Sequence, residues 1–352
     1  MRRADIPKGE GDVLVWSEGA AGRIHLNRPQ AMNALNNVMV RIILRAMSDF
    51  EARDDISAVV VTAQDARSFC AGGDLKELYN LALQDREMAV RIWSEEYILN
   101  ARIATYPKPW LCLVDGLCMG AGMAMAVHGR MVVLSETAQL SMPEVRIGFY
   151  PDVGVTFHLS RLPARLGFYY GLSGRPIAPG RAVEMGLAQA VVPQRLHGEL
   201  IAAIANEADP LMLIQRLALP TPVTMPDELS TFCEEVFSAP TWDECSERLA
   251  ARHCDIGMDL SEMLLRFSPA ALHIAFKALT NAQELPTVPH CLRRDMMMNA
   301  MILQRHDFYE GVRSLFFVRG TEPVWKDDPA TAWPPQFNRI FHENLRGICF
   351  SE

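Results

Sequence analysis

Two short runs of mostly apolar residues limit what this chain can fold into more than any other feature of its sequence. Ala58–Thr62 and Trp110–Val114 show no alternation of polar and apolar side chains, which is typical of strands buried on both faces of a parallel sheet. Each run is followed by a glycine-rich turn and then by a segment with helical character. Strand, turn and helix therefore repeat, which predicts an α/β fold of stacked β-β-α units rather than a sandwich.

The neighbouring segments extend this α/β core in both directions. Further strands are predicted at Val13–Gly19, Ala21–Leu26, Met131–Leu134 and Ala188–Pro193. Asn36–Phe50 has helical spacing, and the apolar face predicted for it consists of Met39, Ile42, Ile43, Ala46 and Phe50. Beyond residue 196 the pattern is mainly helical. We therefore expect an α/β core with the functional site at residues 1–195 and a helical C-terminal region at residues 196–352.

Both glycine-rich turns present backbone N–H groups that lack an intrahelical partner. Cys70–Asp74 and Gly116–Gly122 each stand between a predicted strand and a helix, so these donors belong to a first helical turn. Such donors bind an anion, or a carbonyl oxygen that becomes negative, and glycine allows close approach. One donor from each turn would form an oxyanion hole, whereas the alternative is two tight connections with nothing bound. Neither turn matches the dinucleotide or P-loop fingerprint, which disfavours nucleotide phosphates.

Two carboxylates stand eight residues apart in the segment Leu140–Gly154. Glu144 and Asp152 have apolar neighbours, and loss of hydration raises the pKa of a carboxyl toward values useful for acid, base or nucleophilic chemistry. Glycine and proline between them bend the backbone, so the two acids are candidates for one cavity. The alternative is a pair of surface turn residues.

Composition excludes several other classes of function. A net charge of −8 disfavours a general nucleic-acid surface. The eight cysteines include no CxxC pair, which argues for reduced thiols in a cytoplasmic protein and against a zinc or disulfide framework. No apolar run suits a signal peptide or a membrane span. A metal site could be formed by His306, Asp307 and Glu310, but a hydrogen-bonded cluster at a helix end is the better interpretation of these residues. No cofactor is expected.

Three stretches together resemble the crotonase (enoyl-CoA hydratase/isomerase) superfamily. They are Ile24–Leu35, Ser68–Leu75 and Asp115–Gly122, in the order and spacing of that family. The resemblance implies the crotonase-like (ClpP/crotonase) superhelix of stacked β-β-α units and an acyl-CoA substrate. It assigns the thioester oxygen to the backbone N–H groups of Gly73 and Ala121. Ala121 stands where the family usually has glycine, which keeps the donor but narrows the space above it.

A closer resemblance is to the branch of this family that hydrolyses 3-hydroxyisobutyryl-CoA in valine catabolism. Enoyl-CoA hydratases have a glutamate at the position of Ala124, so the pair of acids used for water addition is incomplete here. The stretches Ser94–Asn100, Met142–Gly154, His306–Arg313 and Glu322–Lys326 fit the hydrolase branch. The resemblance implies that Glu144 is the nucleophile or general base, that Asp152 orients the 3-hydroxyl group or water, and that Glu96 lines the acyl pocket.

The CoA moiety is harder to place from the sequence. The resemblance implies that it borders the backbone of Ala71, Gly73, Asp74, Leu75 and Lys76 and the loop Asn27–Asn33. Lys76 or Arg28 are candidates for its phosphates, although a solvated surface role suits either better. Two other interpretations stay open: an enoyl-CoA hydratase or isomerase of the same fold, and a catalytically silent scaffold. A homo-oligomer is possible, while no nucleic acid or membrane partner is expected.

Overall fold

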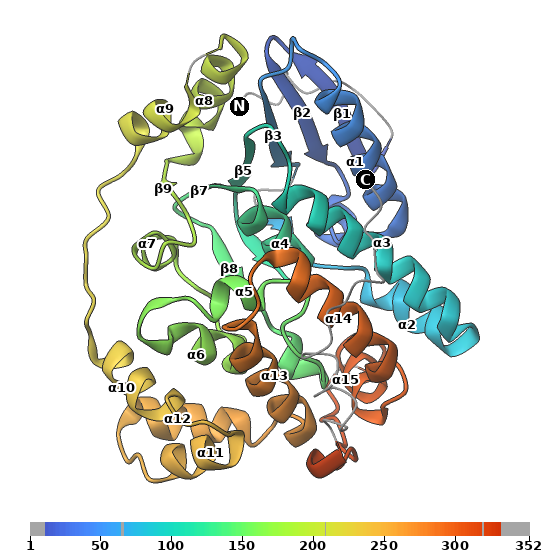
Figure 1. Cartoon of the computed structure of the whole chain (residues 1–352), viewed down its shortest axis with the longest axis vertical. Coiled ribbons are helices and arrows are strands. Elements are labelled where there is room, and N and C mark those ends of the chain that lie inside the picture. The colour runs from blue at the N-terminus through green and yellow to red at the C-terminus, as the bar shows by residue number, and fades with distance from the viewer. Residues whose placement is uncertain (1–10, 65–66, 208, 319, 332–352) are drawn as a thin grey trace. The chain divides into compact units, whose positions relative to one another are not determined.

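The two apolar runs form β3 (Ala58–Ala63) and β5 (Trp110–Val114), which pair in parallel in the computed structural model of the chain. The structure describes residues 11–64, 67–207, 209–318 and 320–331. β3 and β5 occupy the centre of a six-stranded sheet with the order β1-β2-β3-β5-β7-β9 (Figure 1). All five residues of β5 are buried, as expected for a strand covered on both faces.

The remaining strands of this sheet agree with the sequence except in length. β1 (Val13–Glu18) and β2 (Ala21–Leu26), both predicted as strands, form an antiparallel pair, and the turn between them uses Gly19 at φ +54°. β2 then pairs in parallel with β3, and β7 (Arg130–Leu134) with β5. β9 contains only Ala190–Val191 of the predicted strand Ala188–Pro193.

A second sheet of three short strands was not predicted. β4 (Ser68–Cys70), β6 (Leu117–Met119) and β8 (Gln139–Ser141) lie in the order β4-β6-β8. Each is three residues long, too short to show the two-residue period by which a strand is identified from sequence. β3 leads into β4, β5 into β6 and β7 into β8, so the predicted β-β-α repeat is confirmed. The two glycine-rich turns therefore start from strands of this smaller sheet.

Helices pack on the large sheet through apolar faces. α1 (Asn37–Glu51) is preceded by Asn36 as its N-cap. The side chain of Asn36 accepts a hydrogen bond from the Met39 N–H. Its buried face includes Met47, whereas the predicted Ile42 is only half-buried. α8 (His197–Ala205) and α9 (Pro210–Leu217) lie beside each other in Figure 1 and bury aliphatic side chains in one core with the strands. That core includes Val60, Leu111, Val133, Leu200, Ile204, Leu213 and Ile214.

The chain forms two compact units, each assembled from separate segments. Unit 1 takes in residues up to Asp74, Ile98–Leu140 and Ile177–Val223, and it contains both sheets together with α1, α4 (Ala121–His128) and α7 (Pro179–Glu184). Unit 2 takes in Leu75–Tyr97, Ser141–Pro176 and the residues from Thr224 onward. The predicted division into residues 1–195 and 196–352 is a different one, because it separates two continuous stretches of chain. It stays a prediction.

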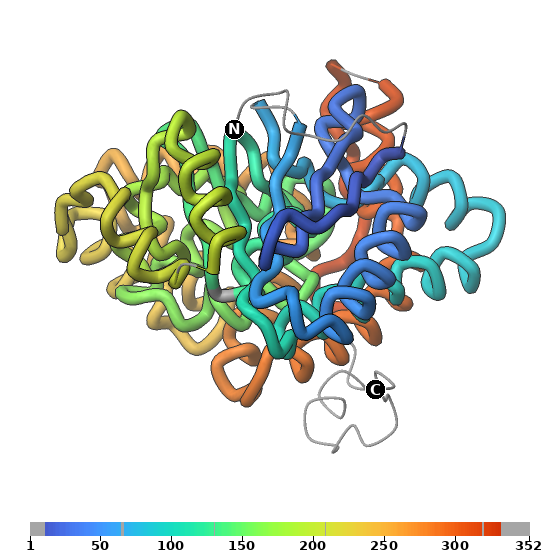
Figure 2. Tube along the Cα trace, turned by 90° about the horizontal axis from the view of Figure 1, so that it is seen from above, coloured from blue at the N-terminus to red at the C-terminus, as the bar shows by residue number. Residues whose placement is uncertain are grey.

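Unit 2 is largely helical. α2 (Leu75–Gln84) and the first turns of α3 (Arg86–Ala104) run side by side in both views (Figure 1, Figure 2). The short helix η3 (Glu144–Ile147), α5 (Thr156–Leu159) and α6 (Leu166–Ser173) follow from the middle of the chain. The C-terminal part contributes α10 (Glu228–Phe237), α11 (Trp242–Ala250), α12 (Asp255–Leu264), α13 (Pro269–Ala282), α14 (Val288–Ile302) and α15 (His306–Phe316). The mainly helical pattern predicted beyond residue 196 is confirmed. Among the described residues, none of the helices has the length and apolar character that a membrane crossing requires.

Candidate active site

In the first glycine-rich turn of unit 1, the Gly73 N–H donates to no backbone oxygen of the described residues. The Leu35 N–H donates to the Gly72 carbonyl oxygen and the Asp74 N–H donates to the Leu35 carbonyl oxygen, both at 2.8 Å. These bonds form a parallel bridge between Leu35 and Gly73 that does not use the Gly73 N–H. Gly72 has φ +102°, a conformation that favours glycine. The bridge thus holds the turn in place while the Gly73 donor stays available.

The second turn lies against the first. Gly120, at φ 51° and ψ −123°, is the N-cap of α4 and provides no side-chain cap, so the Ala121 N–H begins the helix as an open donor. A Cβ placed on Gly72 would lie 3.4 Å from the Met119 carbonyl oxygen and 3.9 Å from the Ala121 nitrogen. The two turns therefore pass so close that a side chain at Gly72 would contact the second turn. Both predicted donors lie in unit 1, and their joint binding of one oxygen remains a prediction.

The residues whose backbone is predicted to border CoA, and the two candidates for its phosphates, differ in the contacts of their side chains. The Arg28 guanidinium forms an ion pair with Asp74 at 2.8 Å and donates to the Ala34 carbonyl oxygen at 2.9 Å. These contacts tie the Asn27–Asn33 loop to the first glycine-rich turn, and a role of Arg28 or Asp74 in binding CoA stays a prediction. Lys76 is exposed, and its ammonium lies 5.6 Å from the centre of the Phe316 ring. Ala71 and Leu75 are half-buried.

In unit 2, Glu144 begins η3, and one of its two carboxylate oxygens lacks a hydrogen-bond partner. The residue as a whole is half-buried, but its Oε2 atom is buried and accepts no hydrogen bond from the described part of the chain. Burial, followed by the charges of Asp152 and Glu96, raises the pKa of Glu144 well above its usual value. A buried polar atom without a partner costs folding free energy, about 1–3 kcal/mol in typical cases. Such a cost is expected where the atom serves a ligand.

Asp152 is held by two side chains that come from distant helices. Both the Tyr97 hydroxyl and the Asn299 amide, the latter at 3.3 Å, donate to its Oδ2 atom. Burial and the charge of Asp295 raise the pKa of Asp152 to about 7, while these two hydrogen bonds lower it. The residue that follows, Val153, has φ +48°, which is rare for a β-branched side chain. Backbone strain of this kind is concentrated at functional sites.

Glu96 on α3 completes a group of three coupled carboxyls. Its side chain is buried, and burial together with the charge of Asp152 raises the pKa of Glu96 to about 8. Glu144, Asp152 and Glu96 therefore titrate as a set rather than singly. Near neutral pH the set retains protons that exposed carboxyls would have lost. The structure thus places the three predicted acids in unit 2 close enough for their charges to interact, and their use as an acid–base group stays a prediction.

A buried polar network around Asp152 was not predicted from the sequence. Its members beyond Asp152 are Tyr97, Tyr150, Thr156, Arg294, Asp295 and Asn299. They belong to segments up to 202 residues apart, so no local pattern links them. One signal was present, because Arg294 and Asp295 are adjacent charges in an otherwise mainly apolar helix. Fully buried charges of this kind have to be paired, which points to a network.

The group at the start of α15 forms the predicted hydrogen-bonded cluster. Asp307 accepts hydrogen bonds from the Ser268 hydroxyl at 2.6 Å and from the Lys326 N–H at 2.7 Å. Glu310 pairs with Arg313 and accepts from the Val324 N–H at 2.9 Å. These bonds fasten the segment around Lys326 to α15. His128, predicted as a core residue, is buried within α4.

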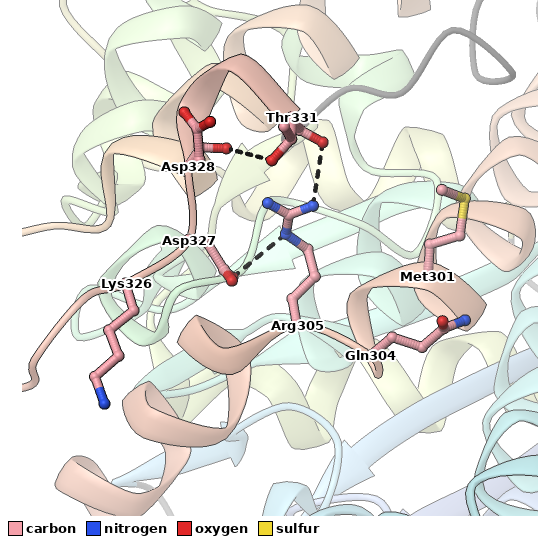
Figure 3. Close-up of a pocket in the computed structure, with 7 residues that line it drawn as sticks. All are labelled: Met301, Gln304, Arg305, Lys326, Asp327, Asp328 and Thr331. Atoms are coloured by element: carbon pink, nitrogen blue, oxygen red, sulfur yellow. Dashed lines mark hydrogen bonds and ion pairs between the residues drawn. The ribbon is translucent and has the colours of Figure 1, made fainter.

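A surface pocket of about 470 Å³ lies between the end of α14 and the segment that follows Lys326. It is lined by Met301, Gln304, Arg305, Lys326, Asp327, Asp328 and Thr331 (Figure 3). Arg305 points to Asp327, at 3.3 Å, and donates to the Thr331 carbonyl oxygen. None of the predicted site residues lines this pocket. The Arg305 guanidinium already has these two partners. The pocket has no net charge, because two basic and two acidic side chains line it.

Comparison with known proteins identifies a family and close structural relatives. The family model described as enoyl-CoA hydratase/isomerase matches residues 21–339. The protein named 3-hydroxyisobutyryl-CoA hydrolase, mitochondrial, of Xenopus tropicalis is 30% identical over 339 residues, which cover 93% of this chain and 88% of that protein. The protein of the same name from Rattus norvegicus is 31% identical over 326 residues, 90% of this chain and 84% of its own length.

Two solved structures resemble the whole chain. A carnitinyl-CoA dehydratase from Mycobacterium thermoresistibile is 31% identical, with a TM-score of 0.88 and coverage of 97% of this chain and 99% of its own. An enoyl-CoA hydratase from Rhodobacter sphaeroides 2.4.1 is 33% identical, with a TM-score of 0.83 and coverage of 94% and 97%. The predicted crotonase-like fold with a helical C-terminal region is thereby confirmed.

Proposed function

Because the chain belongs to the enoyl-CoA hydratase/isomerase family, we propose that it hydrolyses an acyl-CoA thioester, 3-hydroxyisobutyryl-CoA, to 3-hydroxyisobutyrate and CoA. The observation that carries the proposal is the Glu144 carboxylate, which is buried, lacks a hydrogen-bond partner for Oε2 and is coupled to Asp152. Alanine at position 124 removes the other acid that hydration uses. The names of the relatives from Xenopus tropicalis and Rattus norvegicus support the same substrate.

In this proposal the backbone of unit 1 stabilises the oxyanion. The Gly73 and Ala121 N–H groups would donate to the thioester oxygen as the carbonyl carbon becomes tetrahedral. Fixed donors of this kind cost nothing to reorient during the reaction, and loss of one raises the barrier by about 3–4 kcal/mol. The bridge between Leu35 and Gly73 and the helix start at Ala121 support this role because each leaves its donor open.

Glu144 would supply the step that breaks the thioester. As a general base it takes a proton from water, the water oxygen adds to the carbonyl carbon, and the C–S bond breaks with release of CoA thiolate, which is then protonated. As a nucleophile its carboxylate oxygen adds to the carbonyl carbon, the C–S bond breaks with release of CoA thiolate, and water then hydrolyses the mixed anhydride to 3-hydroxyisobutyrate and the free carboxylate. Both routes require the ionised form. Because its pKa is raised, the rate of hydrolysis is expected to rise with pH.

A second candidate is water addition or removal at an enoyl-CoA double bond. It is supported by the names of the two similar structures, a carnitinyl-CoA dehydratase and an enoyl-CoA hydratase. Against it stands Ala124, which cannot take part in proton transfer. A catalytically silent scaffold is the third alternative. A cytoplasmic location and assembly into homo-oligomers stay predictions.

One purified sample tested on two substrates separates these candidates. The hydrolase proposal expects release of free thiol from 3-hydroxyisobutyryl-CoA and no loss of enoyl absorbance from crotonyl-CoA. The reverse result would establish the hydratase. Failure of the protein to bind either thioester would favour the scaffold, and binding by calorimetry is the control that distinguishes an inactive enzyme from a protein without a CoA site.

A further inference from the structure

When Asp152 is ionised, the hydrogen bonds behind it in unit 2 all point toward its carboxylate. The Asn299 amide nitrogen has two hydrogens, and it donates both to the Tyr97 oxygen and to Asp152 Oδ2. The Tyr97 hydroxyl, having accepted that bond, donates its own hydrogen to the same Oδ2. The Asn299 carbonyl oxygen accepts from the Tyr150 hydroxyl at 3.1 Å. With the amide turned around, its oxygen would face the Asp152 carboxylate, two acceptors without a hydrogen between them.

Because two groups donate to Oδ2, a proton on Asp152 fits on Oδ1 but not on Oδ2. An oxygen that accepts from both Tyr97 and Asn299 has no free lone pair for a hydrogen of its own. Protonation of Oδ2 would therefore break one of these bonds. Hydrogen bonds to the charged form of a carboxylate stabilise that form. The network thus opposes the effect of burial on Asp152.

The network is anchored by a buried ion pair on α14. Arg294 and Asp295 are both fully buried and lie 2.8 Å apart, and Asp295 accepts from the Gly154 N–H, also at 2.8 Å. Asp295 and Asn299 are four residues apart and so lie on the same face of α14. Through them one helix holds both Asp152 and the backbone two residues beyond it. Arg294 donates in turn to the Thr156 hydroxyl and to the Ala278 carbonyl oxygen.

From this arrangement we propose that Tyr97 and Asn299 are positioning residues, which hold Asp152 by Oδ2, favour its ionised form and leave Oδ1 for a hydroxyl group of the acyl chain or for water. The inference rests on the proposed function for what Oδ1 would meet, but the state of Asp152 can be measured without it. The charged and titratable groups that face or couple to Asp152 are Glu96 and Tyr97 on α3, Glu144 on η3, Tyr150, and Arg294 and Asp295 on α14.

A direct test follows the Asp152 carboxyl by carbon-13 NMR in protein labelled at aspartate, with Asp152→Asn to assign its signal. The wild-type protein should titrate with a midpoint near 7, as burial and the two donors together require. Tyr97→Phe removes one donor, and the midpoint should rise by about one pH unit or more. Asn299→Leu, which removes the other, should raise it as well. An unchanged midpoint in both variants would overturn the proposal.

Tyr309→Phe is the matched control. Its hydroxyl donates to the Leu303 carbonyl oxygen at 2.8 Å and does not reach Asp152, so the midpoint should stay at its wild-type value. Thermal unfolding of each variant verifies that it is folded. If the Tyr97→Phe protein does not fold, Asn299→Leu still tests the proposal. A shift in Tyr309→Phe equal to that in Tyr97→Phe would also contradict the proposal, because the effect would then be general.

Kinetics provide the second measurement. If the enzyme hydrolyses the thioester, Tyr97→Phe should lower kcat at pH 7 with little change in KM, and activity should recover at a pH above the new midpoint. A change in KM alone, at every pH, would contradict a positioning role. If the wild-type protein hydrolyses no acyl-CoA, the proposed function fails while the NMR titration still decides this inference.

Discussion

At the scale of single residues, backbone donors can be tested by removing the donor and nothing else. Ala121 is the first residue of α4, where proline is well tolerated because its fixed φ suits a helix start. Ala121→Pro thus deletes the N–H group, and the proline ring adds carbon atoms at a buried position, so binding of the thioester by calorimetry is measured beside kcat. Gly120, which precedes it, has the backbone freedom of glycine.

If the Ala121 N–H binds the oxyanion, Ala121→Pro should lower kcat about 100- to 1,000-fold while the protein stays folded. Ala121→Gly keeps the donor and should change kcat only a few-fold, which makes it the control. Steady-state thiol release and circular dichroism measure the two properties. Equal activity in both variants would exclude Ala121 as an oxyanion donor.

Glu96 links stability to pH. Its pKa rises from 4.5 to about 8 in the folded protein, so between these pH values the folded state keeps a proton that the unfolded chain loses. Stability therefore falls as the pH rises through this window. Glu96→Gln should reduce the slope of Tm between pH 4.5 and 8 and raise Tm above the wild-type value at pH 8.5.

Glu262→Gln is the control for this measurement, because Glu262 is exposed and pairs only with Arg266 at the surface. It should leave the slope of Tm against pH as in the wild-type protein. If Glu96→Gln has the same slope as Glu262→Gln, the carboxyl of Glu96 is not the group that keeps the proton.

At the scale of elements, η3 depends on the helix beside it. A Cβ added to Gly311 of α15 would lie 2.2 Å from the Ile147 carbonyl oxygen, and one added to Gly148 would lie 2.4 Å from the Asp307 carbonyl oxygen. Only glycine fits at these two positions. Since η3 carries Glu144, the close packing of α15 fixes the backbone from which the carboxylate extends.

Gly311→Ala should destabilise the protein by about 1–3 kcal/mol, because η3 and α15 must separate to admit the methyl group. Helix propensity alone favours alanine, so a loss reports the contact rather than the helix. Gly180→Ala is the control, since its Cβ would meet only Thr221 at 3.7 Å. Urea unfolding measures both variants, and a Gly311→Ala protein as stable as Gly180→Ala would contradict the packing argument.

The elements and the acids were predictable to different degrees. β3 and β5 were identified because a buried strand is apolar throughout, and α1 because its apolar side chains recur with helical spacing. β4, β6 and β8 were missed because three residues show no period. Glu144, Asp152 and Glu96 were singled out from apolar neighbours and family resemblance. Tyr97 and Asn299 were not, because their roles come from tertiary contacts with Asp152 across 55 and 147 residues of sequence.

At the scale of the whole molecule, neither compact unit is a contiguous stretch of chain. The large sheet is covered by α8, where Leu200, Ile201 and Ile204 are buried, and these residues follow residue 195. In unit 2, Asp152 depends on Asn299. A fragment of residues 1–195 therefore exposes the apolar face of the sheet, and each buried aliphatic side chain is worth about 1.5–3 kcal/mol.

We expect this fragment to lack cooperative thermal unfolding and to be cleaved rapidly by protease, whereas the full chain unfolds cooperatively and resists. Near-ultraviolet circular dichroism is the readout, because it reports fixed aromatic side chains such as Trp110. A fragment with a sharp unfolding transition would show that residues 1–195 form a domain of their own, as the sequence pattern alone predicts.

Thioester hydrolysis by Glu144 is the central claim, and Glu144→Gln measures it most directly. Glutamine has nearly the same shape but can neither accept a proton from water nor form an anhydride, and general base catalysis contributes about 100- to 10,000-fold. Thiol release from 3-hydroxyisobutyryl-CoA by Glu144→Gln should fall at least about 100-fold. Calorimetry should find a Kd for the thioester close to the wild-type value. Thiol release at a near wild-type rate by Glu144→Gln would contradict the claim.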